Sequence, residues 1–445
     1  MNNYIDTVNY LYSLQKHGIK LGLANTLEIM KILGEPQKSF QSIHIAGTNG
    51  KGSTATALSS ILKECGFNVG LFTSPHLISF TERIRLNNIQ ISEQSVIALA
   101  EEIRGLIDGT GLQPTFFEFV TAMAFHYFAS ENVDFGIIET GMGGRFDSTN
   151  VIAPDISIIT NIGLDHCDFL GSSISDIAFE KAGIIKPKVP VITTSKDPDV
   201  VKQLSDIAAE RGSGIHVYDR DFSGSLLSIN DRHIEFNYTG HKSYSNLSFP
   251  LSGRYQLFNA CAAIRASELL MQKGLSIPDR AISEGLSKVK LEGRFEYVSE
   301  NPPIILDGAH NPEAISSLSA SLGDLLPGKK IILVLGVMND KDISGIIEPI
   351  IHNANSIILT KAAYERSAST QRLAETINSL YGPGIKGTAE ISSTENVTEA
   401  INLARSRCDK NSVILITGSF YTTGEAKELL GHTGVLSRLR EKNEK

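Results

Sequence analysis

The stretch from Ile43 to Ser53 constrains this chain more than any other, because it joins a short apolar run to a turn dense in glycine. Gly47, Gly50 and Gly52 can adopt backbone angles that are closed to other residues, so successive N–H groups can converge on an anion. The helix expected to follow adds its positive end. The sequence therefore predicts a phosphate-binding loop between a strand and a helix.

Two side chains of this loop suit a nucleotide. Lys51 is expected to neutralise the β and γ phosphates, and Ser53 to ligate the magnesium that accompanies them. The spacing departs from the usual motif, which has Gly where Ile45 stands and Ser or Thr where Gly52 stands. The residues expected to bind the nucleotide are Gly47, Thr48, Asn49, Gly50, Lys51, Gly52, Ser53 and Thr54.

The composition is that of an ordinary globular enzyme of 445 residues, with 41% hydrophobic and 20% charged side chains. A net charge of -8, a pI near 5.8 and the lack of a long Lys or Arg run argue against a nucleic-acid-binding surface. The four cysteines lie far apart without metal-ligand spacing, as in a reducing compartment. No segment reaches the ~20 apolar residues of a membrane span, and no export signal is recognisable. We therefore expect a cytoplasmic enzyme with small-molecule partners.

Short β-rich runs alternate with longer helical patterns over residues 43–210, which predicts a mainly parallel sheet with helices on both faces. Residues 212–250 alternate apolar and polar side chains, and we interpret them as a few antiparallel strands inserted in the same domain. A second alternation follows a candidate linker at residues 293–303. The predicted fold is α/β: a doubly wound phosphate-loop domain (1–295) with a small antiparallel insertion, then a smaller Rossmann-like α/β domain (296–445).

Polar residues that directly follow the predicted strands are the candidates for chemistry, because ligands of open α/β sheets bind beyond the carboxyl ends of the strands. Ser74, Glu139 and His166 each stand in this position. Magnesium prefers a few hard oxygen ligands, which suits Ser53 and Glu139 and admits His166. Taken singly, Glu139 could be a helix-capping carboxylate and His166 a structural histidine. Their shared place on the sheet of the phosphate loop favours a metal site.

Further motifs follow along the chain: Thr73-Ser74-Pro75-His76, Phe117-Glu118-Phe119, Glu139 to Asp147, Leu164-Asp165-His166, Glu180 to Ile184, Gly253 to Gln256 with Asn259, Gly293-Arg294-Phe295, Leu306 to Pro312, Gly336 to Asp342 and Thr417 to Phe420. Together with the loop, they resemble the folylpolyglutamate and dihydrofolate synthases of the Mur ligase superfamily. The resemblance covers nearly the whole chain. Family members carry Gly-Lys-Gly-Ser at the end of the loop, which accounts for Gly52.

The resemblance implies metal ligands. Ser53 and Glu139 would hold one magnesium with Ser74 close by, and His166 would help to hold a second. Lys181 matches a lysine that family members carry as a carbamate, an anionic ligand where a plain ammonium would repel magnesium. Without the resemblance, Lys181 reads as a surface helix residue. The implied catalytic residues are Lys51, His166 and Lys181, and the implied cofactors are ATP, Mg²⁺ at two sites and a suspected carbamate at Lys181.

The resemblance also implies contacts to the nucleotide and the substrates. Read without it, Asp307 could belong only to a turn, and Arg294 to a weak surface ion pair. The implied nucleotide contacts from the far side of an interdomain cleft are Asn259, Arg294, Asp307 and His310. The implied pterin-side residues are Thr115, Phe146, Asp147 and Ser148, and Ser419 is a further implied substrate contact.

The implied reaction is the ATP-dependent ligation of L-glutamate to a folate-type carboxylate through an acyl phosphate. Dihydropteroate and reduced folates both stay open as acceptors, because Ala24-Asn25 replaces a Glu-Arg pair that relatives carry near the pterin. One alternative is a cell-wall Mur ligase, although those place a nucleotide-sugar domain before the loop and only 46 residues precede Gly47. Another is a non-catalytic nucleotide-binding module. We expect a monomer with no nucleic-acid or membrane partner.

Overall fold

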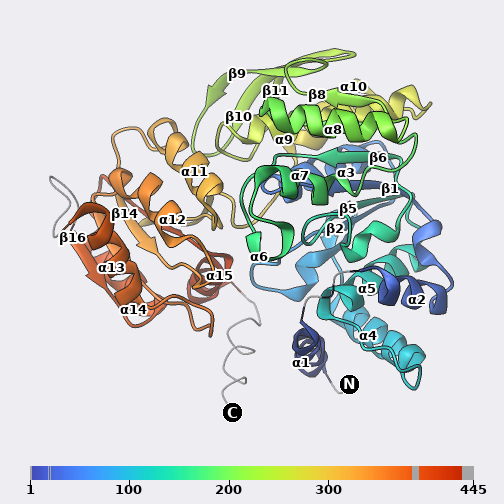
Figure 1. Ribbon diagram of the computed structural model, residues 1–445. Helices are drawn as coiled ribbons and strands as arrows, with labels where there is room; N and C mark the ends of the chain where they lie inside the picture. Colours follow the sequence, from blue (N-terminus) through green and yellow to red (C-terminus); the bar gives the residue numbers. More distant parts are fainter. Residues whose placement is uncertain (1–2, 19, 21, 383–389, 433–445) are drawn as a thin grey trace.

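The computed structural model describes residues 3–18, 20, 22–382 and 390–432. These residues form an eight-stranded sheet, a three-stranded sheet and a six-stranded sheet. Figure 1 shows helices on both faces of the larger sheet, and the second α/β body with its own helices beside it. The predicted fold class is therefore confirmed. We keep the names first domain for residues up to 295 and second domain for residues from 296; this boundary stays a prediction.

The eight-stranded sheet is parallel from β2 to β8, with an antiparallel hairpin at one edge. Its strand order is β4-β3-β2-β5-β1-β6-β7-β8, so β1 lies between two parallel neighbours. The strands are β1 (Gln41–Ala46), β2 (Val69–Phe72), β3 (Ile84–Leu86), β4 (Ile89–Gln90), β5 (Phe135–Glu139), β6 (Ile156–Ile159), β7 (Val191–Thr193) and β8 (Ile215–Val217).

Helices cover both faces of this sheet because side chains of a strand alternate between its faces. Ile45 and Ile158 pack in the core beneath α3, α9 and α10, whereas Ala46 and Ile159 pack in the core beneath α7 and α8. A third core joins α1, α2, α4 and α5. The helices are α1 (Tyr4–Ser13), α2 (Ala24–Ile32), α3 (Lys51–Glu64), α4 (Glu93–Ile107), α5 (Phe116–Ser130), α6 (Cys167–Leu170), α7 (Ile174–Ala182), α8 (Pro198–Glu210), α9 (Gln256–Gln272) and α10 (Asp279–Ser287).

The predicted antiparallel insertion is present, but it is shorter than expected. β9 (Ser223–Ile229), β10 (Ile234–Thr239) and β11 (Ser243–Phe249) form an antiparallel sheet that packs on α9. β8, also within residues 212–250, instead pairs in parallel with β7. The interpretation of the whole segment as antiparallel was therefore wrong, because helix α8 returns the chain to the same edge of the sheet and makes β8 parallel.

The second domain is built on the six-stranded sheet, in the order β12-β13-β17-β14-β15-β16. Only β12 is antiparallel to its neighbour. Its strands are β12 (Glu296–Glu300), β13 (Pro303–Leu306), β14 (Lys330–Leu335), β15 (Ser356–Leu359), β16 (Glu390–Ser393) and β17 (Ser412–Thr417). Its helices are α11 (Pro312–Leu325), α12 (Ile343–Ile350), α13 (Thr370–Tyr381), α14 (Val397–Arg407) and α15 (Phe420–Leu429).

The predicted linker at residues 293–303 was wrong over most of its length. β12 occupies its centre and pairs with β13. Pro302 and Pro303 suggested a break in structure, but a proline is tolerated at the first residue of a strand, and Pro303 opens β13 there. The chain between α10 and the six-stranded sheet therefore ends before Glu296, where β12 begins.

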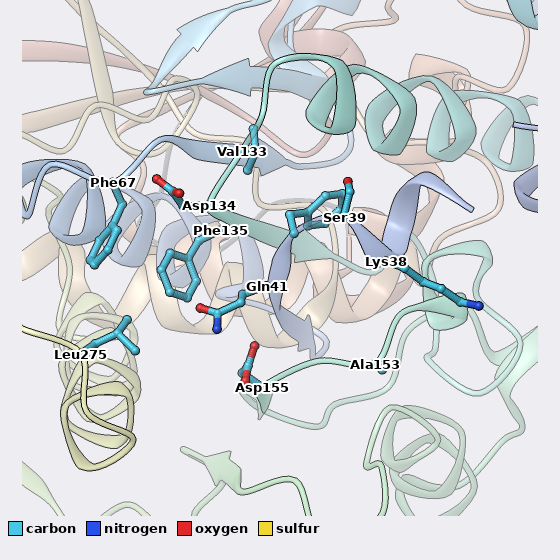
Figure 2. Close-up of a pocket in the computed structure, with 11 residues that line it drawn as sticks. Lys38, Ser39, Gln41, Phe67, Val133, Asp134, Phe135, Ala153, Asp155 and Leu275 are labelled. Carbon is cyan, nitrogen blue, oxygen red and sulfur yellow. The ribbon is translucent and has the colours of Figure 1, made fainter. Parts of the chain in front are cut away.

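An open cavity of about 680 Å³ lies at the amino ends of β1 and β5. Figure 2 shows Phe67, Phe135 and Leu275 on its apolar side, and Gln41 near Asp155. Both strands start at this cavity, so the phosphate loop lies at the other end of the strands, beyond the carboxyl end of β1. Among the helices of the described ranges, none has the length and apolar character needed to cross a membrane.

Candidate active site

The turn between β1 and α3 has a backbone that requires glycine. Gly47 has φ +150° and Gly50 has φ +85°. A Cβ on Gly47 would collide with the hydroxyl of Thr160, and a Cβ on Gly50 would collide with the side-chain oxygen of Asn259. The loop is thus packed between the end of β6 and helix α9, with no space for a side chain at either glycine.

Backbone and side-chain hydrogen bonds join this loop to the segment after β6. Thr48 N donates to Asn161 O over 2.8 Å, and Asn49 N donates to Asn161 Oδ1 over 2.7 Å. The Thr48 hydroxyl donates to Gly163 O and accepts from Gly163 N, at 3.0 and 2.9 Å. The phosphate loop and residues 161–166 therefore form one connected unit.

Two lysines converge on the same carbonyl of the loop. Lys51 Nζ and Lys181 Nζ each donate to Gly47 O over 2.9 Å. Lys181 is only 4% exposed, and burial together with the Lys51 charge lowers the pKa of its amine to about 7. The reading of Lys181 as a surface residue is therefore wrong: α7 directs it inward, against the phosphate loop.

Glu139 ends β5 as a buried carboxylate beside the start of α3. Ser74 N donates to its Oε2 over 3.2 Å, and a Cβ on Gly52 would stand 3.5 Å from the same oxygen. Burial raises the pKa of Glu139 to about 7, although nearby cations and the Ser74 amide oppose that shift. Ser53 is buried in the first turn of α3. A buried, poorly compensated carboxylate next to a phosphate loop fits the approach of a divalent cation.

His166 lies at the N-cap of α6 with φ +53°, and its side chain is 44% exposed. Its Nε2 is 4.0 Å from the carboxylate of Asp165. Although burial opposes ionisation, His166, Lys341 and His310 hold the pKa of Asp165 below its usual range. Within residues 3–18, 20, 22–382 and 390–432, no three His, Cys, Asp or Glu side chains gather into a metal-binding group. The predicted metal set, which relies on hydroxyls and a modified lysine, stays a prediction.

The candidate nucleotide contacts come from α9, from the junction between the domains and from the second domain. Asn259 donates to Gln256 Oε1 and directs its own oxygen at Gly50. Asp307 is buried at the end of β13 and accepts from Phe295 N and Ala309 N, at 3.0 and 2.9 Å. The Asp307 carboxylate therefore shapes the turn that joins β13 to α11.

A small pocket brings residues of both domains together. From the first domain it is lined by Gly52, Ser74 and Glu139, and from the domain junction and α15 by Arg294 and Phe420. The Arg294 guanidinium stands 4.7 Å from the centre of the Phe420 ring. Five sequence-selected segments thus meet in one pocket beside the phosphate loop.

The implied substrate residues come from several elements of the structure. Thr115 caps α5, where Thr115 and Glu118 bond reciprocally. Asp147 is buried and accepts from Met142 N over 2.8 Å. Ser148 follows it and is also buried. Phe146 is 38% exposed. Ser419 is buried at the N-cap of α15.

Sequence reasoning missed the residues that join the two domains. Glu313 accepts from the side-chain amides of Asn49 and Asn161, at 3.1 and 2.7 Å. Asn311 and Lys341 contact Asp165 at 3.0 and 2.7 Å. Asn311 and Lys341 lie within recognised motifs, which was a usable signal. Glu313 had none.

Comparison with known proteins gives the class of the protein. Residues 45–267 match the Mur ligase middle domain, and residues 293–420 match the Mur ligase glutamate ligase domain. A phosphate-loop α/β domain that shares a pocket with a second α/β domain thus defines a Mur-type, ATP-dependent ligase.

Relatives identify the branch of that class. The chain is 35% identical to the dihydrofolate synthase/folylpolyglutamate synthase of Bacillus subtilis, over 96% of this chain and 99% of the relative. It is 32% identical to the Escherichia coli protein of the same name, over 95% and 94%. The chain belongs to the dihydrofolate synthase/folylpolyglutamate synthase family. The predicted resemblance and the predicted ligase activity are confirmed.

Solved structures of relatives match the fold over nearly the whole chain. Folylpolyglutamate synthase of Mycobacterium tuberculosis, solved with ADP and AMPPCP, has a TM-score of 0.89 at 31% identity and covers 97% of this chain and 100% of its own. The Escherichia coli FolC structure with DHPP and ADP has a TM-score of 0.85 at 30% identity, with coverages of 95% and 97%.

Proposed function

We propose that this chain ligates L-glutamate to the carboxylate of a folate-type acceptor, with ATP as the energy source. The observation that carries the proposal is the pocket in which Glu139 and Ser74, beside the phosphate loop, meet Arg294 and Phe420. A phosphate site and a second domain must share one cavity if a nucleotide is to be consumed in a condensation. The bifunctional names and ADP complexes of the relatives support this assignment.

In the first step, a carboxylate oxygen of the acceptor attacks the γ-phosphorus of ATP, and ADP leaves. Lys51 stabilises the negative charge that develops on the phosphoryl oxygens. Magnesium, when bound, neutralises phosphate charge and orients the phosphates. The residues that we assign to hold it are Ser53, Ser74, Glu139, His166 and carbamylated Lys181, at two sites.

In the second step, the amino group of glutamate attacks the acyl carbon, phosphate leaves with the electron pair of the broken bond, and the amine loses a proton. The acyl phosphate hydrolyses readily, so water must be kept out by the second domain. We assign the nucleotide to Asn259, Arg294, Asp307 and His310, in addition to the loop. We assign the acceptor side to Thr115, Phe146, Asp147 and Ser148, and a further substrate contact to Ser419.

The buried amine of Lys181 supports the proposed carbamate. A pKa of about 7 leaves a large fraction of the amine neutral at neutral pH, and only the neutral amine attacks carbon dioxide. Enzyme equilibrated with ¹³C-labelled bicarbonate is expected to give a carbamate carbon signal by NMR. The signal should be absent from Lys181→Arg, whose guanidinium stays charged. If the wild-type enzyme showed no carbamate signal after equilibration with the label, the modification would be refuted.

The acceptor is tested directly. The protein is incubated with Mg²⁺, ATP and labelled glutamate, with dihydropteroate and tetrahydrofolate offered separately, and products are identified by mass. We expect a glutamylated product with at least one acceptor, and one ADP formed per amide bond. No product with either acceptor would contradict the proposal. Phosphate release that needs neither glutamate nor acceptor would instead favour the nucleotide-binding module.

We further propose that the enzyme works in the cytoplasm as a monomer on small molecules alone. A single chain has a mass of 48.3 kDa. Light scattering with ATP and substrates present is expected to give that mass. A mass of twice that value would replace the monomer with a dimer.

A further inference from the structure

Asp165 is held from the second domain by two side chains. Lys341 Nζ lies 2.7 Å from Asp165 Oδ1, and Asn311 Nδ2 donates to Asp165 Oδ2 over 3.0 Å. His310 Nε2 stands 3.9 Å from the same Oδ2. Asp165 directly precedes His166, which we assign to the metal. A residue next to a proposed ligand is therefore fixed by groups more than 140 positions away in the sequence.

The Lys341–Asp165 ion pair is largely removed from water. Its side chains are 14% and 10% exposed, whereas those of Arg254–Asp324, another pair between the domains, are 60% and 33% exposed. A pair in such surroundings is screened little, and removing one partner leaves the other charge desolvated. Lys341 is therefore expected to influence the position of Asp165 far more than Asp324 influences Arg254.

A change in the position of Asp165 would also change the position of the phosphate loop. The segment that carries Asp165 also supplies Asn161 and Gly163, which bond to Asn49 and Thr48. Asn311 connects the second domain directly to the phosphate loop, because its side-chain amide exchanges hydrogen bonds with that of Asn49 at 3.1 and 3.3 Å. Phosphate loop, His166 segment and second domain thus share one hydrogen-bonded network.

We propose that Lys341 is a positioning residue for phosphoryl transfer, which acts through Asp165 to set the His166 segment and the phosphate loop. The inference rests on the proposed function, because it assigns Lys341 a role in that reaction. The second domain then does more than cover the site. It completes the geometry of the first domain.

The kinetic test compares Lys341→Met, Lys341→Arg and the control Asp324→Asn. Lys341→Met is expected to lower kcat about 10- to 100-fold, the usual effect of removing a group that orients a ligand, with changes in KM of less than about 3-fold. Lys341→Arg should recover most of the rate, since it keeps the charge. Asp324→Asn should match the wild type. Thermal unfolding verifies that each variant is folded.

A double-mutant cycle separates positioning through Asp165 from direct contact with substrate. Asp165→Asn combined with Lys341→Met is expected to be no slower than the slower single variant, because both remove the same interaction. The proposal would be overturned if the losses in kcat of the two single variants multiplied in the double variant. It would also be overturned if Lys341→Met left kcat unchanged, or changed only KM.

A readout independent of turnover keeps the test valid if the ligation assay fails. Hydrogen exchange of the amides in residues 161–166 is expected to be about 10-fold or more faster in Lys341→Met than in the wild type or Asp324→Asn. Unchanged exchange would overturn the anchoring of this segment. A wild type without glutamate-dependent turnover, combined with faster exchange in the variant, would instead refute only the proposed function.

Discussion

His44 shows what a single buried ionisable residue contributes to this fold. It lies within β1 and is fully buried, and its Nε2 is 2.8 Å from the hydroxyl of Thr149. That hydroxyl donates to Asp147 Oδ1 over 2.6 Å. Burial lowers the pKa of His44 to about 3, so the ring is neutral. Because the Thr149 hydroxyl gives its hydrogen to Asp147, that hydroxyl accepts from His44 Nε2. Asp147, which we propose as a contact to the folate-type substrate, is thus connected by hydrogen bonds to the strand that leads to the phosphate loop.

Acid should destabilise the protein partly through His44. The unfolded chain takes up a proton near the ordinary histidine pKa of about 6.5, whereas the folded chain does so only near 3, so stability falls as the pH falls through that window. The slope for this one group approaches about 1.4 kcal/mol per pH unit. His44→Gln keeps a donor for Thr149 but does not titrate. Urea unfolding at pH 6 and pH 4 should therefore show a smaller loss for His44→Gln; equal losses would exclude His44 as the cause.

At the same scale, side-chain types indicated ligand candidates but not their surroundings. Glu139 was selected correctly as a residue at a strand end, and its burial is what makes it suitable for a cation. Lys181 on a helix gave no sign of burial, because the 3.6-residue period does not reveal that the loop at residues 141–147 packs against that helix. Gly144 shows the close packing: a Cβ there would stand 2.7 Å from Lys181 O.

Among the elements, the phosphate loop and α3 depend most sharply on one residue type. Gly50 is the N-cap of α3 in a left-handed conformation, directly against Asn259. Gly66, after the other end of the helix, has a similar φ of +89° but open space around it. A side chain at either glycine would be strained by the positive φ, but only at Gly50 would it also collide with a neighbouring residue.

This pair supplies a matched test. Gly50→Ala is expected to destabilise the protein by about 1–3 kcal/mol and to weaken ATP binding at least about 10-fold, because the new methyl group displaces Asn259 or the loop. Gly66→Ala should cost about 1–2 kcal/mol, with unchanged ATP binding. Calorimetric titration with ATP and thermal unfolding measure both. Equal ATP affinities for the two variants would show that the loop tolerates a side chain.

Sequence patterns predicted most elements well, because apolar periodicity and glycine breaks are local signals. Val69–Phe72 and Ile156–Ile159, two of the short β-rich runs within residues 43–210, form strands as expected. β8 and β12 show the limit of such signals. Whether a short strand joins a parallel or an antiparallel sheet depends on the path of the preceding chain, which a local pattern does not contain.

For the whole molecule, the junction between the domains contains a buried cation. Lys427 on α15 is 2% exposed, and its Nζ lies 2.8 Å from Glu292 and 2.6 Å from Glu296. These two carboxylates flank Arg294, a proposed nucleotide contact. Contacts of this kind could not be predicted from the sequence, because they depend on how two separately patterned domains dock. The same is true of Glu313 and Lys341.

Lys427→Met should destabilise the enzyme by about 1–3 kcal/mol, because Lys427 is 2% exposed and its loss leaves Glu292 and Glu296, which are 40% and 22% exposed, without their cation. Lys330→Met removes an exposed partner of Asp409 and should cost less than about 1 kcal/mol. Thermal and urea unfolding of both variants give the comparison. If Lys427→Met lowered the free energy of unfolding as little as Lys330→Met, the two glutamates at the junction would be well hydrated without Lys427.

The position of β1 between β5 and β6 also has a consequence for local opening. A strand with parallel neighbours on both sides and a helical layer on each face exchanges its amide hydrogens only when the whole domain unfolds. Strand β1, which ends at Ala46 directly before the phosphate loop, should therefore belong to the slowest-exchanging part of the chain. Nucleotide would then bind to a loop that begins at one of the last segments of the domain to unfold.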